Sequence, residues 1–181
     1  TTISTLTSSG RKYEYFPHKP GSYTTASSSS SILLNRYVFR DKTYSNKRVD
    51  RGLNALFINC VFEGVLFVVS TSNTTYTTYT NNIRFENCTF NGIIVTDVPK
   101  NAYIRWMQNT LYFTGSAVFN NTSAYQEATI LAPNFNVNLG NTAILEAGSG
   151  NELTGLIVGG IVDVRGNAEI NSIGASTGVC P

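Results

Sequence analysis

The chain has little of what most enzymes use for catalysis or metal binding. Of its 181 residues, 13% are charged, one is a histidine and three are cysteines. The single histidine, His18, is flanked by prolines, so a Ser-His-Asp or Cys-His mechanism would depend on that one side chain. The sequence has no Cys-x-x-Cys, His-Glu-x-x-His, calcium-loop or phosphate-loop motif. We therefore expect a non-catalytic protein with no cofactor and no metal site.

Long apolar runs and helical spacing are missing as well. No run of about 18 apolar residues exists, so no membrane span is expected. We find no convincing stretch with apolar residues at a 3.6-residue period, whereas Thr, Ser, Asn and Tyr are abundant, which favours extended sheet. The chain begins with Thr1 and no signal-peptide core follows, which suggests a processed or trimmed chain and hints at export.

The chain contains one ten-residue phrase twice. Residues 55–64 read ALFINCVFEG and residues 83–92 read IRFENCTFNG, and the matched positions are 28 residues apart. A fixed period in this range is typical of solenoid proteins. In the second copy, apolar and polar residues alternate, the alternation breaks at Asn87, and it then restarts; the first copy has apolar residues at the matching inward positions. Because Asn tolerates left-handed backbone geometry, each copy predicts a strand, a one-residue bend, a second strand and a glycine exit.

The alternation also predicts which side chains face inward. In the second copy, Phe85 and Phe90 are expected in the core and Arg84 is expected outside. Stacked copies would lie about 4.8 Å apart, as neighbouring strands do, so equivalent residues would form ladders. Buried Asn side chains would then hydrogen-bond along the stack. The predicted inward ladder consists of Asn59, Asn87, Cys60 and Cys88.

The positions of the three cysteines predict which of them are buried and which are able to pair. Cys60 and Cys88 occupy equivalent inward positions and are expected to be buried thiols. A disulfide between them stays open, although directly stacked parallel side chains suit its geometry poorly. Cys180, next to the C-terminus, is either free or paired between chains.

The pattern Ile-x-Phe-x-Asn-Cys-x-Phe-x-Gly resembles the coil of the right-handed parallel β-helix superfamily, which includes pectate lyases and phage tailspikes. The resemblance covers residues 53–95, with weaker echoes to about residue 170. It implies an all-β, right-handed parallel β-helix (β-solenoid) of about five coils with an N-terminal β-rich arm. The alternative fold is a β-sandwich or jelly roll. Enzymes of this superfamily use clustered Asp residues; here the nearest approach to a catalytic pair is Asp163 and Arg165 on one strand face.

Charge divides the chain near residue 51. Residues 1–51, interpreted as a basic N-terminal arm and connecting segment, hold nine Lys/Arg and three Asp/Glu, which gives +6. Residues 52–181, interpreted as the β-solenoid domain, hold four Lys/Arg and eight Asp/Glu, which gives −4. This asymmetry favours head-to-tail attraction between copies, although two ordinary solvated surfaces would show it too. No nucleic-acid partner is expected.

Four N-glycosylation sequons are present, at Asn73, Asn87, Asn120 and Asn121. Asn73, Asn120 and Asn121 fall in expected surface connections, where glycans belong. Asn87 is expected to be buried, so its sequon is interpreted as incidental. Use of the other three would agree with export.

The first residues are uncharged and β-prone, and they are followed by a Gly/Pro/Ser-rich connection. Because exposed strand edges recruit other strands, we expect this segment to add as a strand to a neighbouring copy. The residues in question are Thr1, Thr2, Ile3, Ser4, Thr5, Leu6 and Thr7. The expected function is a secreted or cell-surface structural protein that self-assembles head to tail into a pilus-like, adhesive filament. The alternatives are a viral or phage fibre or spike that binds surface glycans, and a polysaccharide-active enzyme.

Overall fold

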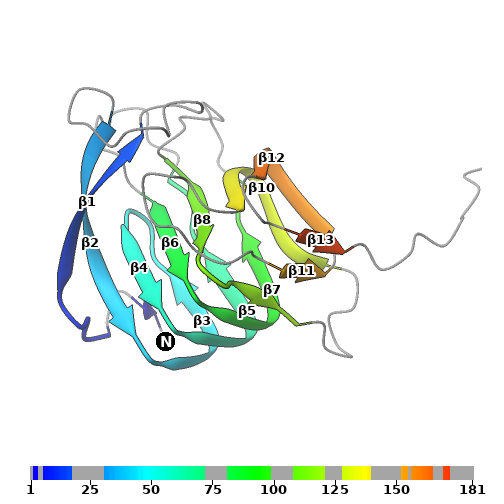
Figure 1. Ribbon diagram of the computed structural model, residues 1–181, viewed down its shortest axis with the longest axis horizontal. Coiled ribbons are helices and arrows are strands. Elements are labelled where there is room, and N and C mark those ends of the chain that lie inside the picture. Colours follow the sequence, from blue (N-terminus) through cyan, green and yellow to red (C-terminus); the bar gives the residue numbers. More distant parts are fainter. Residues whose placement is uncertain are drawn as a thin grey trace, which may run out of the picture.

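The structure is a computed structural model that describes residues 2–3, 6–17, 31–71, 81–98, 108–120, 128–139, 152–154, 156–164 and 169–171. Within these residues the chain forms thirteen strands and no helix, and all the strands belong to one mixed sheet that curls into a half-barrel (Figure 1). The expected all-β class is confirmed. The strands are β1 (Arg11–Pro17), β2 (Ser31–Arg40), β3 (Thr43–Val49), β4 (Ala55–Ile58), β5 (Val61–Val68), β6 (Asn82–Glu86), β7 (Thr89–Thr96), β8 (Thr110–Thr114), β9 (Val118–Phe119), β10 (Ala128–Leu139), β11 (Glu152–Thr154), β12 (Leu156–Val164) and β13 (Glu169–Asn171).

The predicted 28-residue period is the register of the central strands. β4 pairs in parallel with β6, and β5 pairs in parallel with β7, so that Phe57 lies opposite Phe85 and Phe62 opposite Phe90. β6 pairs with β8 at the same offset, which places Phe85 opposite Phe113. Among the described strands, only the β1–β2 hairpin is antiparallel.

β10 is the strand that joins β7 and β8 in the sheet. Its first half pairs with β7 at Ile130 and Leu131, and its second half pairs with β8 from Asn136 to Leu139. β12 then pairs with β10 along both halves. The sheet therefore has β1 at one end and β12 with β13 at the other, and Figure 1 shows these two ends on opposite sides of the molecule.

Two ladders of stacked rings fill the core. Inward aromatic side chains repeat at the register of the strands, so each ring lies on the equivalent ring of the next strand, in the offset-stacked arrangement that aromatic rings favour. Centroid separations of 5.1, 5.3 and 5.0 Å join the first ladder, Phe39, Phe57, Phe85 and Phe113. Separations of 5.4, 5.0 and 4.6 Å join the second, Tyr44, Phe62, Phe90 and Phe119.

The predicted bend residues have the predicted backbone. Asn59 and Asn87 both have φ of 52°, as does Asp41 one strand earlier, and Gly115 follows at 69°. The inward orientation of the Asn side chains is wrong, however, because both lie at the surface. Asn59 Nδ2 donates to Asp41 Oδ1 at 3.1 Å, and Asn87 Oδ1 accepts from the Ser116 amide at 2.9 Å. At each bend the side chain of the left-handed Asn points outward, and the side chain of the next residue, Cys60 or Cys88, is the one that is buried.

Candidate assembly site

The exposed large apolar side chains gather at the two ends of the sheet. At the β1–β2 end these side chains are Tyr13 (64% exposed), Leu33 (51%) and Tyr37 (41%). At the other end they lie on β12 and are Leu156 (52%), Val158 (39%), Ile161 (38%), Val162 (43%) and Val164 (44%). Among the described residues the one exception is Val98, which follows β7. Apolar groups concentrated in this way are typical of contact surfaces, because single scattered apolar side chains are common on any protein surface.

The β1–β2 hairpin is amphipathic because partners in an antiparallel pair point to the same side. Tyr13 pairs with Asn35 and Arg11 with Tyr37, and these side chains share the exposed face with Leu33. On this face the Arg11 guanidinium lies 3.6 Å from the centroid of the Tyr37 ring, and Arg11 Nε donates to Asn35 Oδ1 at 2.8 Å. The face therefore combines apolar rings with a positive charge.

A buried ion cluster holds the other face of the hairpin against the sheet. Glu14 of β1 accepts from the Nε group of Arg36 and, at 2.8 Å, from Nη1 of Arg84 on β6, which is 70 residues away in the chain. Arg84 Nη2 also lies 3.2 Å from a carboxylate oxygen of Glu86. Both guanidinium groups are fully buried. The prediction that Arg84 points into solvent is therefore wrong. The Arg84 side chain does lie on the face of β6 opposite the ring core, but Glu14 of β1 covers it on that face.

The cluster is arranged to stay ionised. Burial alone would raise the pKa of the Glu14 carboxyl, but the Arg36 and Arg84 guanidinium groups outweigh burial and hold that pKa below its ordinary value. Burial lowers the pKa of Arg36, against the effect of Glu14. The ionised Glu14 carboxylate therefore joins β1 to Arg36 of β2 and to Arg84 of β6.

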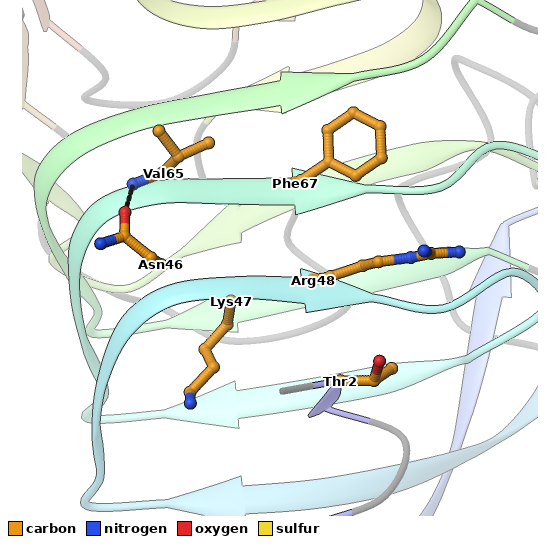
Figure 2. A pocket seen from close by; sticks show the side chains of 6 residues that line it. All are labelled: Thr2, Asn46, Lys47, Arg48, Val65 and Phe67. Atoms are coloured by element: carbon orange, nitrogen blue, oxygen red, sulfur yellow. Dashed lines mark hydrogen bonds between the residues drawn. The ribbon is translucent and has the colours of Figure 1, made fainter.

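A shallow groove of about 360 Å³ lies beside β3 (Figure 2). It is lined by Thr2, Asn46, Lys47, Arg48, Val65 and Phe67. Asn46 has φ of 48° and accepts a hydrogen bond from the Val65 amide at 3.0 Å. The β3–β5 register shifts here, because Gly64 and Val65 of β5 lie opposite the single residue Asn46 of β3. Figure 2 shows Lys47 and Arg48 extending in different directions from β3.

The N-terminal residues that were predicted to join a neighbour lie against their own sheet. Thr2 forms one parallel bridge with Arg48, and Ile3 is fully buried in the core with Leu6 packed against it. Lys42 Nζ donates to the Thr7 carbonyl at 3.2 Å. Thr1, Ser4 and Thr5 lie outside the described residues. Addition of this segment to another copy stays a prediction, and it would require Ile3 to leave the core.

The two buried cysteines form a short thiol ladder at the bends. Cys60 and Cys88 are buried and free. A hydrogen bond with Cys88 lowers the pKa of the Cys60 thiol, whereas burial raises the pKa of Cys88. Because neither side chain reaches solvent, the pair does not present an accessible nucleophile. Cys180 lies outside the described residues.

The remaining predicted positions are only partly described. Asn120 is exposed and its Nδ2 donates to Asn91 Oδ1 at 2.8 Å, while Asn73 and Asn121 lie outside the described residues. Asn87 is exposed, so burial does not exclude a glycan there. His18 and Arg165 are likewise outside the described residues, and Asp163 lies half-buried on β12.

The described part of the chain contains no group of three His, Cys, Asp or Glu side chains able to hold a metal ion. Nor does it contain a helix that is long and apolar enough to cross a membrane.

A second pair of asparagines, outside the repeated phrase and not predicted from the sequence, is buried. Asn81 and Asn109 are 28 residues apart and both have positive φ, at 61° and 49°. Asn81 Nδ2 donates to Asn109 Oδ1 at 3.2 Å, and Asn109 exchanges hydrogen bonds with the backbone of Thr71 at 2.8 and 2.9 Å. The signal was the same 28-residue spacing, outside the repeated phrase.

Comparison with family models, with curated proteins and with solved structures finds no match.

Proposed function

We propose that this chain is a non-catalytic structural protein, exported to the extracellular space or cell surface, that self-assembles head to tail into a pilus-like filament. The observation that carries the proposal is β12. Among the described residues this strand pairs only with β10, and it exposes five apolar side chains along nine residues with Asp163 as its one charge. Soluble monomers usually blunt such an edge with charges, proline or a bulge, so an apolar edge suits addition of another chain.

We also propose that the curled sheet is a short right-handed parallel β-helix. Three successive strands, β4, β6 and β8, repeat at a constant 28-residue register, and β5 and β7 share it. A stack of this kind contacts neighbouring repeats only and leaves a strand edge at each end unless the ends are capped. Such ends give a structural subunit two places for assembly.

A structural role agrees with the chemistry of the described residues. The strongest concentration of charge, around Glu14, is buried and ion-paired. The lining of the groove beside β3 includes Lys47 and Arg48, and Arg48 Nε lies 3.4 Å from Asp50 Oδ1. Hydrolysis of a glycosidic bond would need two carboxyl groups about 5–10 Å apart at an open site.

Sedimentation velocity on the full chain over a concentration series tests the proposal. A heterologous contact that does not close into a ring propagates, so we expect the weight-average mass to rise continuously with concentration. A fixed trimer would favour the glycan-binding spike instead. A monomer that persists at millimolar concentration would overturn self-assembly.

A further inference from the structure

The two ends of the sheet are complementary in chemistry. One end is the exposed face of the β1–β2 hairpin, which presents Tyr13, Leu33 and Tyr37 with Arg11 among them. The other end is β12, which presents an apolar strand containing Asp163. Eight of the nine exposed large apolar side chains among the described residues lie on these two elements. The charges follow the same division, +6 for residues 1–51 and −4 for residues 52–181.

Both elements also end the hydrogen-bonded sheet. Among the described strands β1 pairs only with β2, and β12 pairs only with β10. Each has one edge that no described strand covers, and these edges lie at opposite ends of the sheet (Figure 1). A surface on one end therefore meets the surface on the other end only when a second copy is present.

Buried ion pairs fix the β1–β2 hairpin against the sheet before any second copy binds. Glu14 joins the hairpin through Arg36 and Arg84 to β6, and these groups are buried. A face that is fixed before binding loses little conformational freedom when it binds, which favours association.

We propose that the β1–β2 hairpin of one copy is the seat for β12 of the next copy. This inference rests on the proposed function and names the contact through which the polymer grows. Apolar side chains of β12 cover Tyr13, Leu33 and Tyr37, and Asp163 approaches the basic residues of β1. The contact is heterologous, so each added copy presents a new free β12.

Two variants, one for each end, test the contact. Val162→Lys places a cation on β12 opposite a basic hairpin. Tyr13→Lys removes an apolar ring from the hairpin face and sets an amine against the apolar side chains of β12. Val98→Lys is the matched control, because Val98 is an exposed apolar residue that belongs to neither element. We expect each end variant to raise the concentration needed for polymerisation by at least about tenfold, and the control to change it by less than about twofold. The changed side chains are exposed, and the thermal unfolding midpoint of each variant verifies that it folds.

Mixing the two end variants gives the sharper readout. The Val162→Lys copy keeps an intact hairpin, and the Tyr13→Lys copy keeps an intact β12. An equimolar mixture should therefore form dimers that do not grow, whereas each variant alone stays monomeric. Absence of the mixed dimer would overturn the contact, because intact faces would then fail to meet. If the unmodified chain polymerises and both end variants polymerise equally well, the contact is wrong and the filament proposal stands. If the unmodified chain never polymerises, the proposed function itself fails.

Discussion

At the scale of single residues, the buried carboxylate of Glu14 is central to how the β1–β2 hairpin is attached. Its carboxylate is buried and contacts two buried guanidinium groups that come from strands far apart in the sequence. Removing one partner from a buried ion pair leaves an uncompensated charge, which is costlier than the loss of the pair as a whole. The stability of the hairpin therefore depends on all three side chains together.

Replacement of Arg84 tests this arrangement. We expect Arg84→Ala to lower the free energy of unfolding by roughly 3–5 kcal/mol, because Glu14 loses one of its two buried cations. Phe85→Ala on the same strand should cost a similar amount, roughly 3–5 kcal/mol, by leaving a cavity in the ring ladder. Arg40→Ala is the control: Arg40 is exposed on β2, and its removal should change stability by less than about 0.5 kcal/mol. Denaturant titrations in which Arg84→Ala behaves like Arg40→Ala would show that the cluster does not stabilise the fold.

The same cluster predicts a pH dependence. Burial would raise the pKa of Glu14, but Arg36 and Arg84 lower it below its ordinary value of 4.5. A depressed folded-state pKa adds stability that is complete above the unfolded-state pKa and is lost as the pH falls through the folded-state pKa. The free energy of unfolding should therefore decrease on acidification below about pH 4.5, with a shallower decrease in Glu14→Gln. Equal slopes in the two proteins between pH 5 and 3 would contradict the role of Glu14.

At the scale of elements, the bends and their neighbouring glycines set how closely the strands approach. Gly92 of β7 lies directly opposite Gly64 of β5, and a Cβ added to Gly92 would be 1.9 Å from the Gly64 carbonyl oxygen. Such a contact forces the two backbones apart. The prediction that the chain leaves the strand at these glycines is wrong, because Gly64 and Gly92 lie inside β5 and β7, where they allow the two backbones to approach closely.

Substitution at this contact has a clear expected cost. We expect Gly92→Ala to destabilise the protein by roughly 3 kcal/mol, at the upper end of the usual range for overpacking, because backbone atoms cannot move aside as a flexible side chain can. Glu63→Ala on β5, one residue before Gly64, changes an exposed side chain and should be nearly neutral. The comparison is made by thermal and denaturant unfolding, and similar stabilities for the two variants would show that β5 and β7 are not in this register.

Surface connections lead to a prediction about modification. If the chain passes through a glycosylating secretory pathway, glycan is expected on Asn73 and on Asn120 or Asn121. Asn87 is exposed, so the earlier reason for expecting it to stay bare no longer applies. Glycopeptide mass spectrometry measures each sequon, and the absence of glycan from Asn73, Asn120 and Asn121 in such a host would count against export.

The strands and bends could be predicted from the sequence because their causes are local. A left-handed Asn between two alternating runs and a fixed period give the bend, the register and the ring ladders directly. The sequence could not show what covers the outer face of β6, because the partner of Arg84 is 70 residues away and periodicity reports only the side of a strand. Nor could the sequence show whether Ile3 would pack on the sheet of its own chain or on that of another copy, because an uncharged, β-prone segment fits any open strand edge.

At the scale of the whole molecule, a continuous core joins two unlike ends of the sheet. Stacked rings run through this core from Phe39 to Phe113 and from Tyr44 to Phe119. The β1–β2 hairpin carries Arg11 and Lys12, whereas β12 carries Asp163 as its one charge. Attraction between such ends is partly electrostatic, so we expect longer assemblies at about 0.01 M than at about 1 M ionic strength.

Electron microscopy of the purified full chain at low ionic strength tests head-to-tail assembly. We expect unbranched filaments one subunit wide, which lengthen as the protein concentration is raised. Particles that remain single subunits at every concentration, or that close into a compact oligomer of fixed size, would contradict head-to-tail assembly.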